Sequence, residues 1–479
     1  MEQFLKILKI LGTLLEVILL FNLLIVVHEL GHYWAAKWRG LKVDKFQIWF
    51  GPTLWKKTIN GVQWGLGSIP AGGFVALPQM APMEMVEGGD AEKRRNLPPI
   101  SPLDKIIVAF AGPLFSFLLA IVFACVVWKV GRPVSSFEAT TVLGTVVPGM
   151  PAYETGLRVG DEILTIEGTP IRSFFGLTNS VISGIALSDK ESIEIVVRRP
   201  GEPEPIVFHV KPKAANSKGM FDRGTVRKIG VGPSALPVVG EIIPGSPADK
   251  AGMKTGDRVL SVDGQPITIG QMVDELGRRK EGSNIVLAVQ RSADDGSSQS
   301  LEMTVQAIKP LKPDTYLPMI GVFWGGEVVL SHPSPMDQIH KAATTIITTV
   351  RALVSPTSDI GVKHLSGPIG IGGAFYDMLT SDYGWQLALW FGVVVNVNLA
   401  IMNLLPLPIL DGGHITLAIL EKIRRRPINI KVLEYLQTAF ALLLLGFMLY
   451  VTVLDVGDRA KSSAPAEDAG PAVVFPETP

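Results

Sequence analysis

The sequence predicts a polytopic α-helical membrane protein with four transmembrane helices, a membrane-associated β-hairpin, and two tandem β domains inserted between helices two and three. Hydrophobic residues make up 47% of the 479 residues and charged residues 18%, whereas about a quarter of an average soluble domain is charged. The apolar residues are concentrated in four long runs, and the segment between the second and third runs contains an internal repeat. Basic and acidic residues number 44 each, and this zero net charge argues against nucleic-acid binding.

Each of the four apolar runs is long enough to cross the hydrocarbon core of a bilayer, which is roughly 30 Å thick. They cover residues 10–27, 106–130, 385–405 and 432–454. The first run could also belong to a cleaved signal peptide. It is longer than the usual apolar region of about 7–15 residues and no Ala-x-Ala-like site follows it, so we expect a retained helix. The membrane parts are therefore expected at 1–130 and 384–454.

Clustered basic residues orient these runs. They lie in the loop between the first and second runs and in the loop between the third and fourth. By the positive-inside rule both loops are cytoplasmic, so the long segment 131–384 and both termini face outward. We expect a multi-pass protein of the bacterial cytoplasmic (inner) membrane whose outward side is the periplasm. The tail 455–479 is rich in alanine, proline and acidic residues and is expected to be disordered.

The outward segment contains a tandem repeat. Residues 147–171 and 243–267 share eleven of 25 positions at a constant offset of 96 residues. This period exceeds the roughly 20–50 residues of a solenoid unit, so we expect two separate domains. In each repeat a short alternating strand is followed by a glycine turn, which indicates β structure. We expect the two domains at 138–213 and 230–312.

A candidate metal site begins at the end of the first run, where the chain reads His28-Glu29-Leu30-Gly31-His32. On a helix the residues i and i+4 share a face, so both imidazoles can reach a single ion. Imidazole nitrogen suits Zn²⁺, and Glu29 would lie beside the ion as the general base for a bound water. The alternative is a polar cluster at the cytoplasmic interface, where charged side-chain tips extend to water.

A catalytic zinc site requires three protein ligands and an open position. The single cysteine, Cys125, lies inside an apolar run and is not suited as the third ligand, and a lone cysteine also excludes an internal disulfide. The best candidate is Asp411, which follows the third run in a segment where Pro406 and Pro408 break the helix. Asp411 could instead be an ordinary turn residue of the sequence Asp-Gly-Gly.

Together these features resemble the site-2 protease family of intramembrane zinc metalloproteases, most closely its bacterial regulator-of-sigma-E type with two PDZ domains. The resemblance rests on the order of three patterns: His-Glu-x-x-His, the repeated Gly-Asp-x-(Ile/Val)-Leu-x-(Ile/Val)-x-Gly-x-Pro-Ile of PDZ domains, and Asn-x-x-Pro-x-x-x-Leu-Asp-Gly. It implies that one Zn²⁺ per chain is bound by His28, His32 and Asp411. It further implies that Glu29 activates water and that Asn403 holds the substrate or its developing oxyanion.

A β-hairpin is predicted between the first two runs, because two alternating strands flank an Asn-Gly turn at 60–61. The chain continues through Gly72, Gly73, Phe74 and Val75. Here the family has a membrane-reentrant β-loop that pairs with an unwound substrate helix, so the resemblance implies that these four residues bind substrate. Family members often read GGYVKM at this place and this chain reads GGFVALPQM, a change that preserves pairing through the backbone. A surface hairpin without substrate contact is the alternative.

Three further features have open roles. Ala111-Gly112-Pro113 opens the second run as in the family, but Ser116 stands where the family usually has asparagine, so no role is carried over to it. Residues 334–355 are predicted to form an amphipathic helix that lies on the outer membrane surface or against the second repeat. His414 could orient a metal ligand, although a solvated position at the end of the loop is the more common role of such a histidine.

The sequence therefore predicts an intramembrane zinc metalloprotease that cleaves single-span membrane proteins in the bilayer, as in the regulated release of an anti-sigma factor. The outward PDZ pair is expected to admit only substrates whose outer domain has already been removed, and its grooves could bind peptides. Two spacer domains that bind nothing are the alternative for this pair. For the whole chain, the alternatives are a membrane-anchored PDZ adaptor with a structural or inactive metal site and, more remotely, a transporter. Glu29 has no use in a structural site, and the sequence shows no inverted repeat of the kind that many transporters have.

Overall fold

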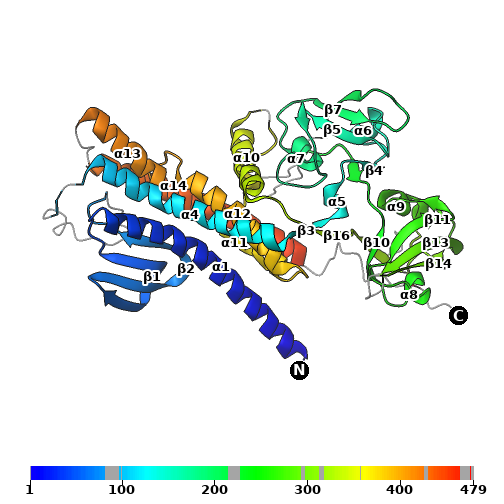
Figure 1. Cartoon of the computed structure of the whole chain (residues 1–479), viewed down its shortest axis with the longest axis horizontal. Helices are drawn as coiled ribbons and strands as arrows, with labels where there is room; N and C mark the ends of the chain where they lie inside the picture. Colours follow the sequence, from blue (N-terminus) through cyan, green and yellow to red (C-terminus); the bar gives the residue numbers. More distant parts are fainter. Residues whose placement is uncertain are drawn as a thin grey trace. The chain divides into compact units, whose positions relative to one another are not determined.

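The computed structural model describes residues 2–80, 97–98, 100–213, 227–292, 297–311, 318–356, 358–425, 430–463 and 475. The chain divides into two compact units, whose elements are labelled in Figure 1. The first, the membrane unit, comprises Met1–Arg132, His332–Ile346 and Ser366–Asp455. The second, the β unit, comprises Pro133–Ser331, Ile347–Leu365 and Val456–Pro479.

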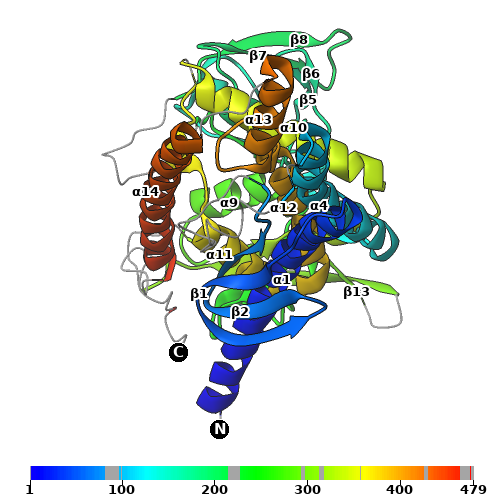
Figure 2. The same ribbon diagram turned by 90° about the vertical axis from the view of Figure 1, so that its left-hand side faces the viewer.

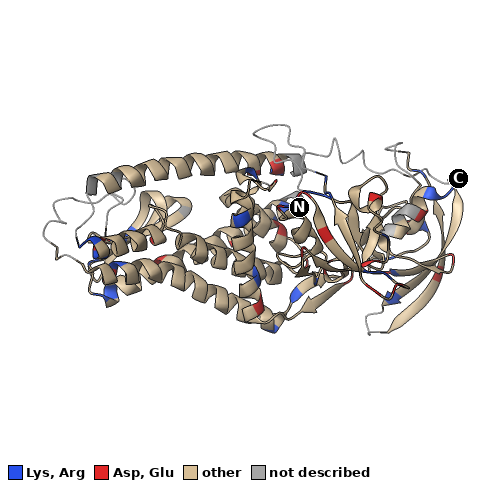
Figure 3. Ribbon diagram, turned by 90° about the horizontal axis from the view of Figure 1, so that it is seen from above, with Lys and Arg blue, Asp and Glu red and all other residues tan. Residues whose placement is uncertain are grey.

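Among the described residues, four helices are long and apolar enough to cross a membrane: α1 (Glu2–Trp38), α4 (Pro102–Val130), α12 (Gly384–Asn403) and α14 (Ile430–Ser463). They coincide with the four apolar runs, which confirms the prediction of a polytopic helical membrane protein. Figure 3 shows that the long helices are uncharged over most of their length.

The C-terminal tail differs from the expectation of disorder at 455–479. α14 continues to Ser463, so residues 455–463 are helical. Once a helix is nucleated, each added residue contributes a hydrogen bond, and the helix can therefore extend past the point where the composition turns polar. Apart from Phe475, the rest of the tail lies outside the described residues.

The helix α4 is central to the membrane unit, where it packs against α1, α12 and α13 (Asp411–Arg424). It begins at Ser101, whose side chain accepts a hydrogen bond from the backbone N–H of Asp104. Small side chains on α4 allow the neighbouring helices to approach closely. The buried small residues are Ala109, Ala111, Gly112, Ser116, Ala120 and Ala124.

A shorter helix, α11 (Pro368–Leu379), packs against α1 and α12. Its buried Phe375 contacts the rings of Phe21 and Phe391. The carboxylate of Asp455 on α14 accepts hydrogen bonds from the N–H groups of Gly367 and Gly370, at 2.9 and 2.8 Å, at the start of α11. A fixed polar contact therefore ties the last spanning helix to α11.

The predicted hairpin is present as β1 (Lys45–Ile59) and β2 (Val62–Ala76), which pack beside α1 (Figure 2). Both strands fold back on themselves, so that Phe46 pairs with Trp64 as well as with Val75. The rings of Phe46 and Trp64 stack with their centroids 4.5 Å apart, in a hydrophobic core shared with α1 and α4. This core fixes the last part of β2 beside α1.

The β unit contains two hydrophobic cores, one for each sequence repeat. In the first repeat the strand order is β6-β5-β7-β8, and in the second it is β14-β13-β11-β10-β15, with β12 beside β11. The first set has the bounds β5 (Glu162–Ile166), β6 (Thr169–Pro170), β7 (Ile193–Arg198) and β8 (Ile206–Val210). The second has β10 (Val238–Ile242), β11 (Arg258–Val262), β12 (Gln265–Pro266), β13 (Ser283–Ser292), β14 (Ser298–Ala307) and β15 (Val322–Gly325).

The strands that follow each repeat extend the two domains beyond the expected ranges. β9 (Val231–Pro233) falls in the range 230–312 expected for the second domain, yet it pairs with β4 (Leu143–Val146) of the first. Likewise β15 lies past residue 312 and pairs with β10. The sequence repeat covers only the middle of each domain, so it could not show which later strand completes each sheet.

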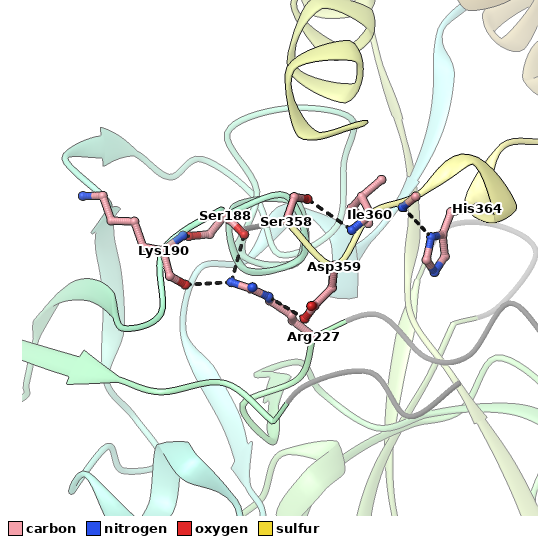
Figure 4. A network of polar contacts seen from close by, with 8 residues as sticks. Ser188, Lys190, Arg227, Ser358, Asp359, Ile360 and His364 are labelled. Carbon is pink, nitrogen blue, oxygen red and sulfur yellow. Dashed lines mark hydrogen bonds and ion pairs between the residues drawn. The ribbon is translucent and has the colours of Figure 1, made fainter. Parts of the chain in front are cut away.

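The remaining elements are shorter strands and helices, some of which, such as α7 and α9, contribute residues to the cores of the two repeats. They are β3 (Arg132–Ser135), β16 (Val328–Ser331), α5 (Ser136–Ala139), α6 (Pro151–Glu154), α7 (Val181–Ala186), α8 (Pro247–Lys250), α9 (Ile269–Arg278), α10 (Pro335–Val354) and a 3-10 turn at Val362–His364. α10 is the helix predicted at 334–355. The loop that follows α10 is held to the first repeat by Arg227, which bonds the Asp359 carboxylate at 2.7 Å and the carbonyls of Ser188 and Lys190 (Figure 4).

Candidate metal centre

Two imidazoles face each other on α1. His28 and His32 are one turn apart, and their Nε2 atoms lie 3.2 Å from each other. The helix continues to Trp38, so both side chains are carried on rigid backbone rather than on a loop. This placement brings the two Nε2 atoms to one point inside the membrane unit.

The carboxylate of Asp411 completes this group. Asp411 is the first residue of α13, and its Oδ2 and Oδ1 lie 3.3 Å from the Nε2 atoms of His28 and His32 respectively. The two glycines that follow are required by crowding: a Cβ on Gly412 would lie 2.2 Å from the carbonyl oxygen of Leu404, and one on Gly413 would lie 2.1 Å from that of Leu407. The glycine pair therefore lets the start of α13 press against the loop that follows α12.

These three side chains fit a zinc ion. Each offers one ligand atom, and these atoms lie within 4.8 Å of one another. The two Nε2 atoms are 3.2 Å apart, and each lies 3.3 Å from one of the two carboxylate oxygens of Asp411. Ligands of a tetrahedral zinc ion with bonds of about 2.0–2.2 Å lie about 3.3–3.6 Å from one another. Two histidines and one carboxylate also leave the fourth position open, as a catalytic site requires.

The electrostatics of the group also suit a cation. The Nδ1 of His32 lies 2.8 Å from the carbonyl oxygen of Val108, which can only accept a hydrogen bond, so Nδ1 carries the proton. In the neutral ring the Nε2 lone pair then points toward Asp411. Burial raises the pKa of Asp411, but His32 and His28 lower it by more, so its pKa falls below the ordinary range and the carboxylate is ionised.

A cavity of about 320 Å³ opens beside the three candidate ligands. Its wall includes every residue to which the sequence assigned a role at the site: Glu29, Asn403, Gly72, Gly73, Phe74 and Val75, together with His28, His32 and Asp411. Glu29 follows His28 directly, and its carboxylate is hydrogen-bonded to the backbone of Val75. Asn403 reaches the cavity from the C-terminal end of α12.

The last part of β2 forms one side of this cavity. Residues 73–76 pair with residues 45–48 of β1, and Gly72–Val75 line the cavity. A Cβ on Gly73 would lie 3.0 Å from the carbonyl oxygen of Gln47 and 3.5 Å from the Cγ of Glu29. Glycine therefore lets this part of the strand lie close to the carboxylate of Glu29.

Other residues of the site carried little signal in the sequence. His414 lies on α13 in the cavity wall, where burial lowers its pKa, and the solvated position that the sequence favoured for it does not fit this place. Ser116 lies 3.0 Å from the Nδ1 of His28, a contact between residues 88 positions apart.

Comparison with known proteins gives one family and several relatives. The chain matches the model of peptidase family M50 over residues 16–447. It is 28% identical to the protease RseP of Yersinia pestis, over 92% of this chain and 98% of the relative, and equally so to the regulator of sigma-E protease RseP of Escherichia coli K12. A relative from Neisseria meningitidis, 28% identical over 92% of this chain and 97% of its own, is provisionally named a zinc metalloprotease.

Proposed function

The chain belongs to peptidase family M50, the family of the site-2 proteases, and from this premise we propose that it hydrolyses peptide bonds within the membrane-spanning segments of other proteins. The observation that carries the proposal is the group formed by His28, His32 and Asp411, which lies beside Glu29 and the strand residues Gly72–Val75 in one cavity. The elements that hold these residues include α1 and α12, two helices long and apolar enough to cross a membrane.

The chemistry divides among five side chains and one ion. His28, His32 and Asp411 would hold one Zn²⁺ per chain, which supplies a Lewis acid and lowers the pKa of a bound water. Glu29 is placed to take a proton from the attacking water and to return it to the leaving amine. The amide N–H groups of Asn403 can donate to the negative charge that develops on the scissile carbonyl.

A second requirement is to bind the unwound backbone of the substrate, and residues Gly72–Val75 of β2 would meet it. A transmembrane helix hides its peptide groups in internal hydrogen bonds, so it must unwind before a peptide bond can be attacked. The released backbone groups then need partners in a site without bulk water. An open strand edge provides them by β-augmentation, which depends on backbone rather than on side chains. We assign these four residues to substrate binding on this basis.

The two repeated β domains are proposed to be PDZ domains that face the periplasm and filter substrates. The support is the sequence pattern of the repeats and the charge of the two basic loops, which places both termini outside and the active site toward the cytoplasmic side of the inner membrane. Substrates would be single-span proteins already shortened on the outer side, such as an anti-sigma factor. If removing both domains leaves an intact, full-length substrate uncleaved, the filter is contradicted.

The decisive experiment compares Glu29→Gln with Glu16→Gln in the purified full-length protein, with a single-span model substrate and zinc content by elemental analysis. Both changes remove one carboxylate from α1, but Glu16 is exposed and lies three turns from the cavity. We expect one zinc per chain in both variants and a loss of cleavage of about 10²–10⁴-fold in Glu29→Gln only. Undiminished cleavage by Glu29→Gln contradicts the mechanism, and wild-type protein without zinc contradicts the metal site.

A further inference from the structure

One face of α4 lies directly behind the two histidines. Val108, Gly112 and Ser116 are spaced by four residues, so they form a row along a single helix face. All three are buried. A Cβ on Gly112 would lie 2.2 Å from the Nε2 of His32 and 2.8 Å from the Nε2 of His28. Only glycine leaves room for both imidazoles at the middle of this row.

The two ends of the row contact the two rings. The carbonyl of Val108 accepts a hydrogen bond from the Nδ1 of His32 at 2.8 Å, and the hydroxyl of Ser116 lies 3.0 Å from the Nδ1 of His28. A histidine that binds a metal through Nε2 usually donates its other N–H to an oxygen, which fixes the tautomer and the ring orientation. For His32 that oxygen belongs to the backbone, and for His28 it is a side chain.

We propose that Ser116 is a positioning residue for His28, which holds the imidazole so that its Nε2 points to the metal position. The inference rests on the proposed zinc site and goes beyond it, since it assigns a task to a residue that is not itself a ligand. The hydroxyl accepts a hydrogen bond from the Nδ1–H group of His28, and the Nε2 lone pair is then directed to the ion. Ser116 is 0% exposed, so bulk water does not compete with its hydroxyl for the Nδ1 of His28 in the folded protein.

The test measures zinc affinity by competition with a chelator in the full-length protein. Ser116→Ala removes only the hydroxyl, Ser116→Thr keeps it, and Thr345→Ala is the control, because its hydroxyl bonds the carbonyl of Lys341 on α10. We expect the zinc Kd of Ser116→Ala to rise about 10–100-fold, as for loss of other outer-shell partners. The melting temperature without metal should match that of the wild type, while the rise on adding zinc becomes smaller.

Other results would overturn the assignment. A zinc Kd of Ser116→Ala equal to that of the wild type shows that the hydroxyl does not position His28. If Ser116→Ala melts lower without metal, Ser116→Thr decides: restored zinc affinity supports positioning, and affinity as weak as that of Ser116→Ala contradicts it. Wild-type protein that binds zinc and cleaves substrate keeps the proposed function intact in each of these cases.

Discussion

The carboxylates of Asp161 in the first repeat and Asp411 in the membrane unit are both shielded from water, but their partners differ. Asp161 accepts hydrogen bonds from Arg199 through Nε and Nη2, both at 2.8 Å, and from the N–H of Arg158. Asp411 instead faces the Nε2 atoms of His28 and His32. The first carboxylate is satisfied by the protein alone, whereas the second faces two imidazoles that, in the proposed site, would share a cation with it.

The repeat shows that the first arrangement is structural. Asp257 occupies the position of Asp161 in the second repeat, 96 residues later. It accepts from Arg291 through Nε and Nη2 at 2.7 Å and from the N–H of Lys254 at 2.8 Å. Because the same set of partners surrounds both carboxylates, we infer that this contact stabilises the fold of each repeat. An incompletely paired carboxylate next to a cavity indicates a binding site.

The largest effect is expected from Asp411→Ala. Because it removes a ligand rather than a partner of a ligand, zinc affinity should fall by more than the roughly 10–100-fold cost of losing an outer-shell contact. Cleavage of a single-span substrate should become undetectable, and the amide exchange of the β unit should stay unchanged. Elemental analysis, the cleavage assay and hydrogen exchange measure these three quantities. Retained zinc in this variant would remove Asp411 from the ligand set.

The second largest effect is expected from Asp161→Asn, which should change only the stability of the first repeat. Asp161→Asn leaves the guanidinium of Arg199, which is 15% exposed, without its counter-charge. Breaking a buried ion pair by removing one partner costs roughly 3–5 kcal/mol. We expect faster amide exchange in β5 and β7, while zinc content stays at the wild-type value. Asp257→Asn is the matched variant and should loosen β11 and β13 in the same way.

Zinc loss in either variant would contradict the distinction between the two kinds of carboxylate. The double change Asp161→Leu with Arg199→Met tests whether the ion pair can be replaced by apolar residues. Replacing a buried ion pair by apolar residues is often neutral, so this double variant should be more stable than Asp161→Asn. Hydrogen exchange of β5 again provides the measurement.

The sequence was sufficient to predict the features that depend on spacing and composition. The four apolar runs became four helices because length and hydropathy determine a membrane span, and the i, i+4 spacing of His28 and His32 determines that they share a helix face. Asp411 was within reach of sequence reasoning because a carboxylate after a long apolar run is rare. In each case the signal is local in the chain.

Features that depend on pairs distant in the chain were not predictable in this way. The contact of Ser116 with His28 joins residues 88 positions apart, and the tie between Asp455 and the start of α11 joins residues 85 and 88 positions apart. Only packing of the helices creates such pairs, and no periodic pattern reports it. The strand β9 is a similar case, because it pairs with β4, which lies more than 80 residues earlier in the chain, and its own three residues do not indicate that partner.

The smallest expected effect concerns pH and Asp263, which follows β11 in the second repeat. Its carboxylate accepts a hydrogen bond from the N–H of Val286 and forms an ion pair with Arg279. Both contacts lower the pKa of Asp263. A lowered pKa contributes stability that is present above the unfolded value of about 3.9 and is lost as the pH falls through the folded value.

Asp263→Asn should therefore destabilise the second repeat at pH 6, and the difference from the wild type should shrink below about pH 4. Hydrogen exchange of β11 and β13 at both pH values checks this, and a difference that grows toward low pH would show that the carboxylate is not stabilised by its contacts. Asp263 is partly exposed and satisfied by the protein, so zinc affinity should be the same in this variant as in the wild type.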